Sequence, residues 1–464
     1  MKTRTKIISF ISVSAILFTI GSPGLQAYPQ STAGQNTSRV LSLEECIAIA
    51  RANNLDVKRQ VLQVDAARSD LWLAQAANLP RLSGWYTHNL NSGKTVNFED
   101  YSYINTQYQD GNAGLQARLP LFQGLQGWNR IQQGRLALQT AEQQAEAMEI
   151  QITLQVVTAY LQILLSEELV KIAEEKLQIS SDQVIQAEEF FKTGRVAKSE
   201  VLVMKSQAAQ DQLDLVSRKG DLDLAYLVMR QLLNLENEVD FAVAQPEDQD
   251  TDNVFIPSAS SVYDIAKNNQ PRIAAAQSFM MANEAALRLA RGSLSPSVSL
   301  GGVFYSRYSE LGVNPLDPEA FYPYMEQLGD NRYMQANLRL EVPILTRFSD
   351  GYQRQISQAK INVMDSRLAL EQEKKSVREE IQQAESLAKA AMARLQASDE
   401  AAKSAQEAND IIREQFEAGI VTAIDLRISG NQLLEATSNQ TTAKYELILR
   451  SKILDIYMGK QVDL

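Results

Sequence analysis

The sequence contains one cysteine and one histidine, Cys46 and His88, in a chain of 464 residues. A single cysteine excludes an internal disulfide framework and any metal site built from cysteines. A single histidine removes the usual ligand of zinc and the usual general base of a hydrolase. We therefore expect no metal, no cofactor and no catalytic centre, and the chain is predicted not to be an enzyme.

Positive charge, glycine and proline are also scarce. The 45 Lys and Arg residues are outnumbered by 56 Asp and Glu residues, and such an acidic chain is a poor partner for nucleic acid. Beyond the N-terminus no run of about 18 apolar residues occurs, so no membrane-spanning helix is expected. With 21 Gly and 12 Pro, and long stretches dominated by Ala, Gln, Glu, Leu and Lys, the composition favours long helices over compact globular domains.

The first residues have the layout of a secretory signal peptide, predicted to span residues 1–27. Three cations precede an apolar stretch, residues 7–20, that is too short to cross a membrane as a helix. Cleavage is expected after Ala27, and a polar segment, residues 28–41, follows. Cys46 lies too far past the apolar stretch to be the lipidated cysteine of a bacterial lipoprotein. The protein is therefore predicted to be exported and not lipidated.

The rest of the chain is predicted to consist of two structural repeats, residues 42–250 and 251–464. Leu119-Pro120-Leu121 matches Val342-Pro343-Ile344, and the motif around Gly194 matches the motif around Gly419. Other matches, such as Pro80 with Pro296, occur in the same order, which is typical of an internal repeat.

Each repeat is expected to contain an opening helix, two strands, a long helix and a return helix. The first opening helix begins with a capping box at Ser42 and Glu45 and ends before Pro80. Apolar and polar residues alternate over the strands, and the long proline-free stretches predict helices of about 100 Å that turn at glycine. The expected ranges are 42–78 and 262–294 for the opening helices, 82–89, 112–121, 297–308 and 333–342 for the strands, 90–111 and 309–332 for surface loops, and 124–191 and 351–416 for the long helices, with return helices ending near 235 and 458.

More than half of the aromatic residues lie in the two strand regions, residues 81–128 and 297–352. Aromatic residues near strand ends are typical of the interfacial girdles of outer-membrane barrels, although the core of a soluble sheet is an alternative. The candidate interface residues are Trp85, Tyr86, Phe122, Trp128, Phe304, Tyr305, Tyr308 and Tyr352.

Four strands cannot close a barrel, since bacterial barrels begin at about eight strands, and open strand edges are not tolerated in lipid. The chain is therefore expected to contribute its strands to an oligomeric barrel of 8, 12 or 16 strands. Two, three or four copies of the chain would give these numbers of strands.

The repeat, the proline-ended strands and the Phe-x-x-Gly-x-Val turns resemble the TolC family of outer-membrane efflux proteins over nearly the whole mature chain. This resemblance implies a homotrimer in which one twelve-stranded barrel continues into a helical tunnel across the periplasm. It also implies two kinds of partner, a periplasmic adaptor (membrane fusion) protein and an inner-membrane transporter. The implied function is a passive exit duct for tripartite efflux or type I secretion, with no cargo indicated.

The resemblance also assigns functions to residues near the two glycine turns. In the family the turns contact the adaptor, which here implies Phe191, Gly194, Arg195 and Val196, with Phe416, Gly419, Ile420 and Val421. The family's acidic constriction at the periplasmic entrance corresponds to Asp425, with Glu200 at the matching place in the first repeat. Ile428 stands where the best-known member has a second aspartate, so an apolar constriction is an alternative. Ordinary helix turns and solvated surface acids would explain the same residues.

Two other functions are weighed against the exit duct. A periplasmic coiled-coil adaptor or structural protein would share the signal peptide and the helices, but it does not need two pairs of alternating strands. An outer-membrane hydrolase would need a Ser/His/Asp set or a paired-acid motif, and neither is found. If the protein can be extracted from cells without detergent, the periplasmic adaptor or structural protein is favoured over the exit duct.

Overall fold

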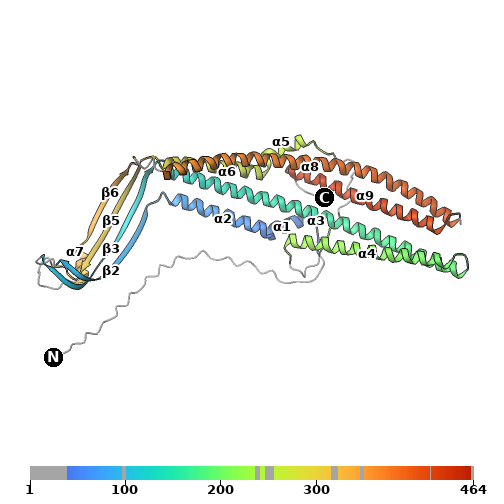
Figure 1. Ribbon diagram of the computed structural model, residues 1–464, viewed down its shortest axis with the longest axis horizontal. Helices are drawn as coiled ribbons and strands as arrows, with labels where there is room; N and C mark the ends of the chain where they lie inside the picture. The colour runs from blue at the N-terminus through green and yellow to red at the C-terminus, as the bar shows by residue number, and fades with distance from the viewer. Residues whose placement is uncertain are drawn as a thin grey trace, which may run out of the picture.

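The computed structural model describes residues 39–96, 101–235, 241–245, 255–314, 322–344, 350–418 and 420–460. The expected signal peptide, most of segment 28–41 and Gly419 therefore lie outside the described residues. The molecule is elongated, with a sheet at one end and helices running away from it to two turns at the far end (Figure 1). It is mainly helical with a smaller strand portion, as the composition predicted.

Two helices, one in each half of the chain, run most of the length of the rod. α3 spans Gln126–Lys192, 67 residues, and α8 spans Asp350–Glu417, 68 residues, so each is about 100 Å long. Each is followed by a return helix, α4 at Lys198–Leu233 and α9 at Ala423–Tyr457. The predicted long helices and return helices are confirmed.

The opening helices are each broken in two, and the expectation of one continuous helix was wrong. α1 (Leu43–Asn53) and α2 (Leu55–Ala76) are separated by Asn54, whose extended backbone lets its side chain accept from the Asp56 N–H. α5 (Ala259–Asn269) and α6 (Pro271–Gly292) are separated by Gln270, because a residue that precedes proline avoids the helical conformation. The predicted capping box of Ser42 and Glu45 is present.

The larger sheet is antiparallel in the order β2-β3-β5-β6, with β2 at Arg81–Val96, β3 at Tyr103–Gln123, β5 at Ser297–Ser309 and β6 at Tyr333–Glu341. Residues 90–111 were predicted to be a loop, but β2 and β3 stay paired out to Val96 and Tyr103. This polar hairpin has no apolar alternation that would have revealed it. The second expected loop contains a short helix, α7, at Tyr324–Asp330.

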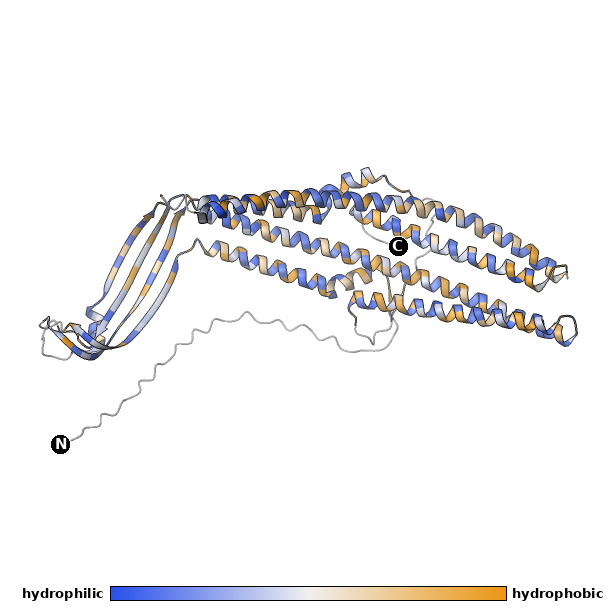
Figure 2. Ribbon diagram, viewed as in Figure 1, coloured by the Kyte–Doolittle hydropathy of each residue, from blue (hydrophilic) through white to orange (hydrophobic). Residues whose placement is uncertain are grey.

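The register divides the sheet into an apolar face and a polar face, and the alternation is visible along each strand in Figure 2. Directly opposed residues of antiparallel strands point to the same side, so the two faces can be read from the pairing. The polar face includes Arg81, Gln116, Ser299 and Arg339. The apolar face is formed by Leu82, Tyr86, Ala113, Leu115, Ala117, Leu119, Phe122, Val298, Leu300, Phe304, Met334, Ala336, Leu338 and Leu340.

The helices form a layer in the same order as the strands. α2 packs against α3, α3 against α6, and α6 against α8, so α2 and α8 lie at the edges, as β2 and β6 do in the sheet. Beyond α1, α4 continues along α3 toward the turns, while α9 packs on α8 and α3. The expected stacking of two shorter helices along one long helix is therefore observed.

The main core lies where these helices meet midway along the rod. Its centre includes Val156 and Tyr160 of α3 with Met229 of α4, all almost completely buried. The Tyr160 hydroxyl donates to the carbonyls of Leu41 and Ala244, next to a parallel two-stranded sheet of β1 (Arg39–Leu41) and β4 (Phe241–Val243). One stretch of α3 is long and apolar enough to cross a membrane, but half of it is buried, as in the core helix of a bundle.

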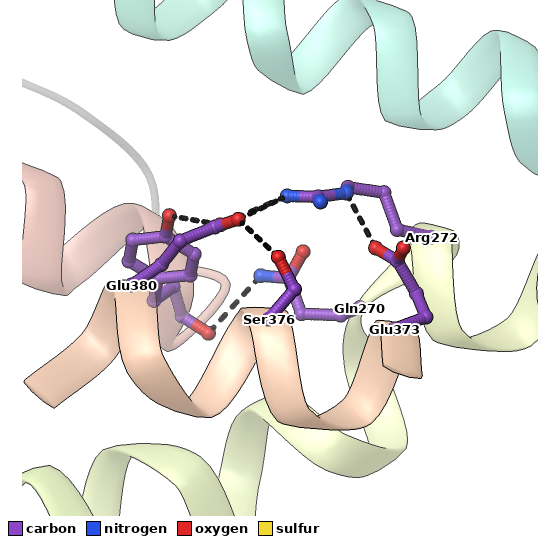
Figure 3. Close-up of polar contacts among 6 residues, drawn as sticks. Gln270, Arg272, Glu373, Ser376 and Glu380 are labelled. Carbon is purple, nitrogen blue, oxygen red and sulfur yellow. Dashed lines mark hydrogen bonds and ion pairs between the residues drawn. The ribbon is translucent and has the colours of Figure 1, made fainter. Parts of the chain in front are cut away.

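A network of ion pairs and hydrogen bonds connects the start of α6 and the end of α9 to the middle of α8 (Figure 3). Arg272 forms ion pairs with Glu373 at 2.7 Å and with Glu380 at 2.8 Å. Glu380 also accepts a hydrogen bond from the Tyr457 hydroxyl at 2.9 Å. Burial raises the pKa of Glu380, but the hydrogen bonds from Arg272 and Tyr457 outweigh this effect and hold the pKa below its usual value.

Candidate functional site at the helix tips

The first tip is the turn between α3 and α4. Gly194 has φ +74°, the left-handed conformation that ends many helices, and a Cβ built on it would have no atom within 4 Å. The Arg195 N–H donates to the Phe190 carbonyl at 2.8 Å, which closes the turn. The Arg195 guanidinium lies 5.5 Å from the centre of the Phe190 ring, and Phe191 is 46% exposed. Phe190, which was not among the predicted tip residues, therefore holds this turn together.

The second tip, between α8 and α9, has the same closing hydrogen bond. The Ile420 N–H donates to the Gln415 carbonyl at 2.9 Å, five residues back, as at the first tip. Gly419, the predicted hinge, lies outside the described residues. Ile420 is 74% exposed, so it extends an apolar side chain into solvent at the end of the rod.

A groove of about 710 Å³ separates the two tips. It contains five of the predicted tip and gate residues: Arg195, Val196, Glu200, Phe416 and Val421. Residues that were not predicted also line it, among them Phe190, Met204 and Leu426. Of the other predicted tip and gate residues that the structure describes, none lines the groove: Phe191, Gly194, Ile420, Asp425 and Ile428.

The two predicted acids have different surroundings. Glu200, in the first turn of α4, faces the groove and is half-buried. The Asp425 carboxylate instead accepts hydrogen bonds from the N–H and hydroxyl of Thr422 and completes the capping box of α9. These bonds hold the pKa of Asp425 below its usual value. Ile428, one turn further along α9, is 47% exposed.

A polar chain connects the two coiled coils just behind the tips. Arg427 of α9 donates to the Gln207 side-chain oxygen of α4 at 3.1 Å. The Gln207 amide in turn donates to Asp211 at 2.9 Å, and Lys176 of α3 lies 3.3 Å from the same carboxylate. The Asp211 side chain is only 2% exposed, so this series of polar contacts begins at a buried residue of the α3–α4 coiled coil.

The connection between Arg427 and Gln207 was not predicted from the sequence. The two residues are 220 positions apart, and nothing in the local pattern distinguishes them from other polar residues on helices. Arg427 does lie two residues after Asp425, within the expected gate region. Within the described ranges, no group of three or more His, Cys, Asp and Glu side chains is placed to hold a metal ion.

The strand register shows which of the predicted interface aromatics lie on the apolar face of the sheet. Tyr86, Phe122 and Phe304 lie on the apolar face and are exposed. Tyr308 lies on the same face but is buried, with Tyr324 of α7 at a ring distance of 4.4 Å.

The remaining four aromatics are not on the apolar face of the sheet. Trp85 and Tyr305 lie in one row of the polar face, where Trp85 donates to Asn112 at 2.6 Å. Trp128 and Tyr352 were predicted to lie near strand ends. Trp128 lies in α3 and Tyr352 in α8, so both belong to the helices that follow the strands.

Comparison with known proteins gives consistent matches over most of the chain. The model of the outer membrane efflux protein family matches residues 46–235 and 262–460. Outer membrane efflux protein BepC of Brucella suis biovar 1 (strain 1330) is 22% identical over 414 residues, which cover 89% of this chain and 84% of BepC.

Solved structures show the same fold. The Campylobacter jejuni CmeC outer membrane channel superimposes with a TM-score of 0.77 at 15% identity, covering 95% of this chain and 93% of CmeC. The outer membrane protein VceC of Vibrio cholerae gives a TM-score of 0.74 at 15% identity, covering 90% of this chain and 96% of VceC. The predicted resemblance to the TolC family is thereby confirmed.

Proposed function

This chain belongs to the outer membrane efflux protein family, and we propose that it is the passive exit duct of a tripartite efflux or type I secretion system. Membership of the family supports the general function of an outer-membrane channel for efflux. The duct would carry cargo from an inner-membrane transporter through the periplasm and out of the cell. The same proposal includes three further features. Segment 1–27 directs export, the mature chain carries no lipid, and the chain has two repeats, residues 42–250 and 251–464.

The observation that carries the proposal is a four-stranded sheet with one apolar face and two open edges. Lipid does not tolerate open strand edges, so β2 of one copy must pair with β6 of another. Three copies would give twelve strands, and the helix layers would continue the ring. The edge helices present apolar side chains suited to this packing, with Val61 and Leu62 exposed on α2, and Ile361 and Leu368 exposed on α8.

The height of the apolar face agrees with a membrane position. From Val298 to Tyr308 the strand rises about 33 Å, or about 23 Å along the membrane normal at a tilt of about 45°. Outer-membrane barrels have an apolar band of about 25 Å. Phe122 at the inner end, with Phe304 and Tyr86 toward the outer end, would then contact the lipid interfaces.

The tips are suited to bind an adaptor. Phe191 and Ile420 are exposed apolar residues at the free end of a rod, and the groove between the tips has both apolar and charged walls. A bulky residue at Gly419 is expected to abolish export while barrel assembly survives. Unchanged export in that variant would contradict the docking role.

We further propose that the hydrogen bond between Arg427 and Gln207 helps to hold the periplasmic entrance closed. It is a polar connection between the α3–α4 and α8–α9 coils close to the tips, so separation of the coils would break it. Asp425 and Ile428 would narrow the entrance of the trimer as an acidic and an apolar ring, respectively, with Glu200 in the groove beside them.

Membrane fractionation and size determination of the purified protein test the exit-duct proposal. We expect extraction only with detergent, a trimer in solution and ion-conducting channels in planar lipid bilayers. Ala336→Arg, on the apolar face and near the middle of the apolar band, should prevent insertion, while Gln335→Arg, on the polar face of the same strand, should be tolerated. A monomer that is soluble without detergent would instead indicate a periplasmic rod.

A further inference from the structure

Three arginines gather on the polar face of the sheet at the end where the strands join the helices. Arg81 of β2 is directly opposite Arg118 of β3. Arg339 of β6 lies on the far side of β5, about 10 Å across the sheet from Arg118, in the next row toward the helices. All three side chains are exposed. Among the described residues, no carboxylate forms an ion pair with any of them, although the chain as a whole carries a net charge of −11.

The pairing of Arg81 with Arg118 is unfavourable by itself. Directly opposed residues of an antiparallel pair have Cβ atoms about 5 Å apart, and like charges in this position destabilise a sheet. The neighbours on this face do not compensate, because they are neutral: Ser83, Gln116, Gly301 and Asn337. The nearest acid by register is Glu341, two residues past Arg339 on the far strand.

Two opposed guanidinium groups match the chemistry of an oxyanion. Each guanidinium presents a planar fork of N–H donors that binds a carboxylate, sulfonate or phosphate with two parallel hydrogen bonds. Gly301, which is paired with Arg118 in the same row, is covered by the neutral side chain of Asn337, so no charged side chain lies on that side of the pair. A bound oxyanion would also remove the repulsion between the two cations.

We infer that Arg81 and Arg118, reinforced by Arg339, form an oxyanion-binding site on the inner wall of the barrel where it meets the helical tunnel. The inference that this wall faces the lumen rests on the proposed function. In a trimer the site occurs three times and makes a cationic belt that concentrates the anionic groups of passing cargo. The belt acts over about 8 Å at physiological ionic strength.

The test uses the full-length protein in detergent and the trisulfonate dye pyranine, with binding followed by fluorescence anisotropy in about 0.1 M salt. Relative to wild type, we expect Arg81→Gln with Arg118→Gln to raise the dissociation constant at least tenfold. The double lysine variant keeps the charges but not the planar fork of N–H donors. Its dissociation constant should lie between those of wild type and the double glutamine variant. In about 1 M salt the differences should shrink, because the screening length falls to about 3 Å.

Arg307→Gln is the matched control, since Arg307 lies on the same face of the sheet but toward its outer end, paired with Asn112. It should change dye affinity less than twofold. Equal affinity of wild type and the double glutamine variant overturns the site, as does an equal loss in the control.

The dye-binding test and the exit-duct proposal can fail independently of each other. Arg81 and Arg118 belong to one chain, so their binding of the dye does not require a trimer. A monomeric, non-conducting protein would contradict the duct even if the pair binds the dye. A conducting trimer with unaltered dye binding in the double glutamine variant would contradict only the oxyanion site.

Discussion

Substituting Arg427 with alanine should open the periplasmic end of the channel. The change removes the guanidinium that donates to Gln207 at 3.1 Å between the two coils. A hydrogen bond that involves a charged group contributes about 1.5–3 kcal/mol, and we take the lower value because Arg427 is only half-buried. Since about 1.4 kcal/mol corresponds to a factor of ten, each protomer would favour the open state by roughly tenfold. If the three protomers open together, the ratio of open to closed channels rises by about a thousandfold.

Single-channel recording of the purified protein in planar bilayers measures this ratio directly. Arg427→Lys, which can still donate to Gln207, should change the ratio much less. Lys205→Ala is the matched control, because Lys205 pairs with Glu188 at 2.7 Å within one coil near the same tip. If Arg427→Ala trimers have the open fraction of wild type, or if the Lys205 control opens equally, the inter-coil connection does not close the channel.

Three other variants address the tip, the gate and the barrel. Gly194→Val should weaken adaptor capture while the trimer still forms, because a side chain at φ +74° costs about 1–2 kcal/mol although space is available; co-purification of a crosslinked adaptor measures this. Asp425→Ala should alter conductance and cation block. Since Thr422 lowers the pKa of Asp425, block in the wild type should persist to acidic pH and fade only as the pH falls through that lowered value. Block that is identical in the alanine variant removes Asp425 from the gate. Ala336→Arg, paired with Gly302 near the middle of the apolar band, should cost about 2–4 kcal/mol and abolish trimer insertion, whereas Gln335→Arg should insert normally; equal insertion would contradict the assignment of the two faces.

The elements that local sequence patterns specify were predicted well. Long helices follow from proline-free stretches, the capping box at Ser42 from residue types three positions apart, and the inner parts of the strands from strict alternation. The breaks at Asn54 and Gln270 were missed, since each is a single residue between two stretches that are both helical. The outer part of the β2–β3 hairpin was missed because it is polar on both faces.

The tip site was predicted only in part for a similar reason. The motifs around Gly194 and Gly419 indicated where the chain turns, and the repeat indicated that the two turns correspond. That Arg195 and Glu200 share a groove with Phe416 and Val421 depends on the packing of two coils, which no local pattern contains.

The sequence by itself determined the composition of each face, the lengths of the helices and the family, since these depend on neighbouring residues and on motifs in order. The tertiary structure alone decided which distant polar residues meet. Arg427 reaches Gln207 across 220 positions, and the strand register places Arg81 directly opposite Arg118. A shift of one residue in that register would have turned every side chain of the strand to the other face, so the cationic wall depends on pairing that only the folded sheet specifies.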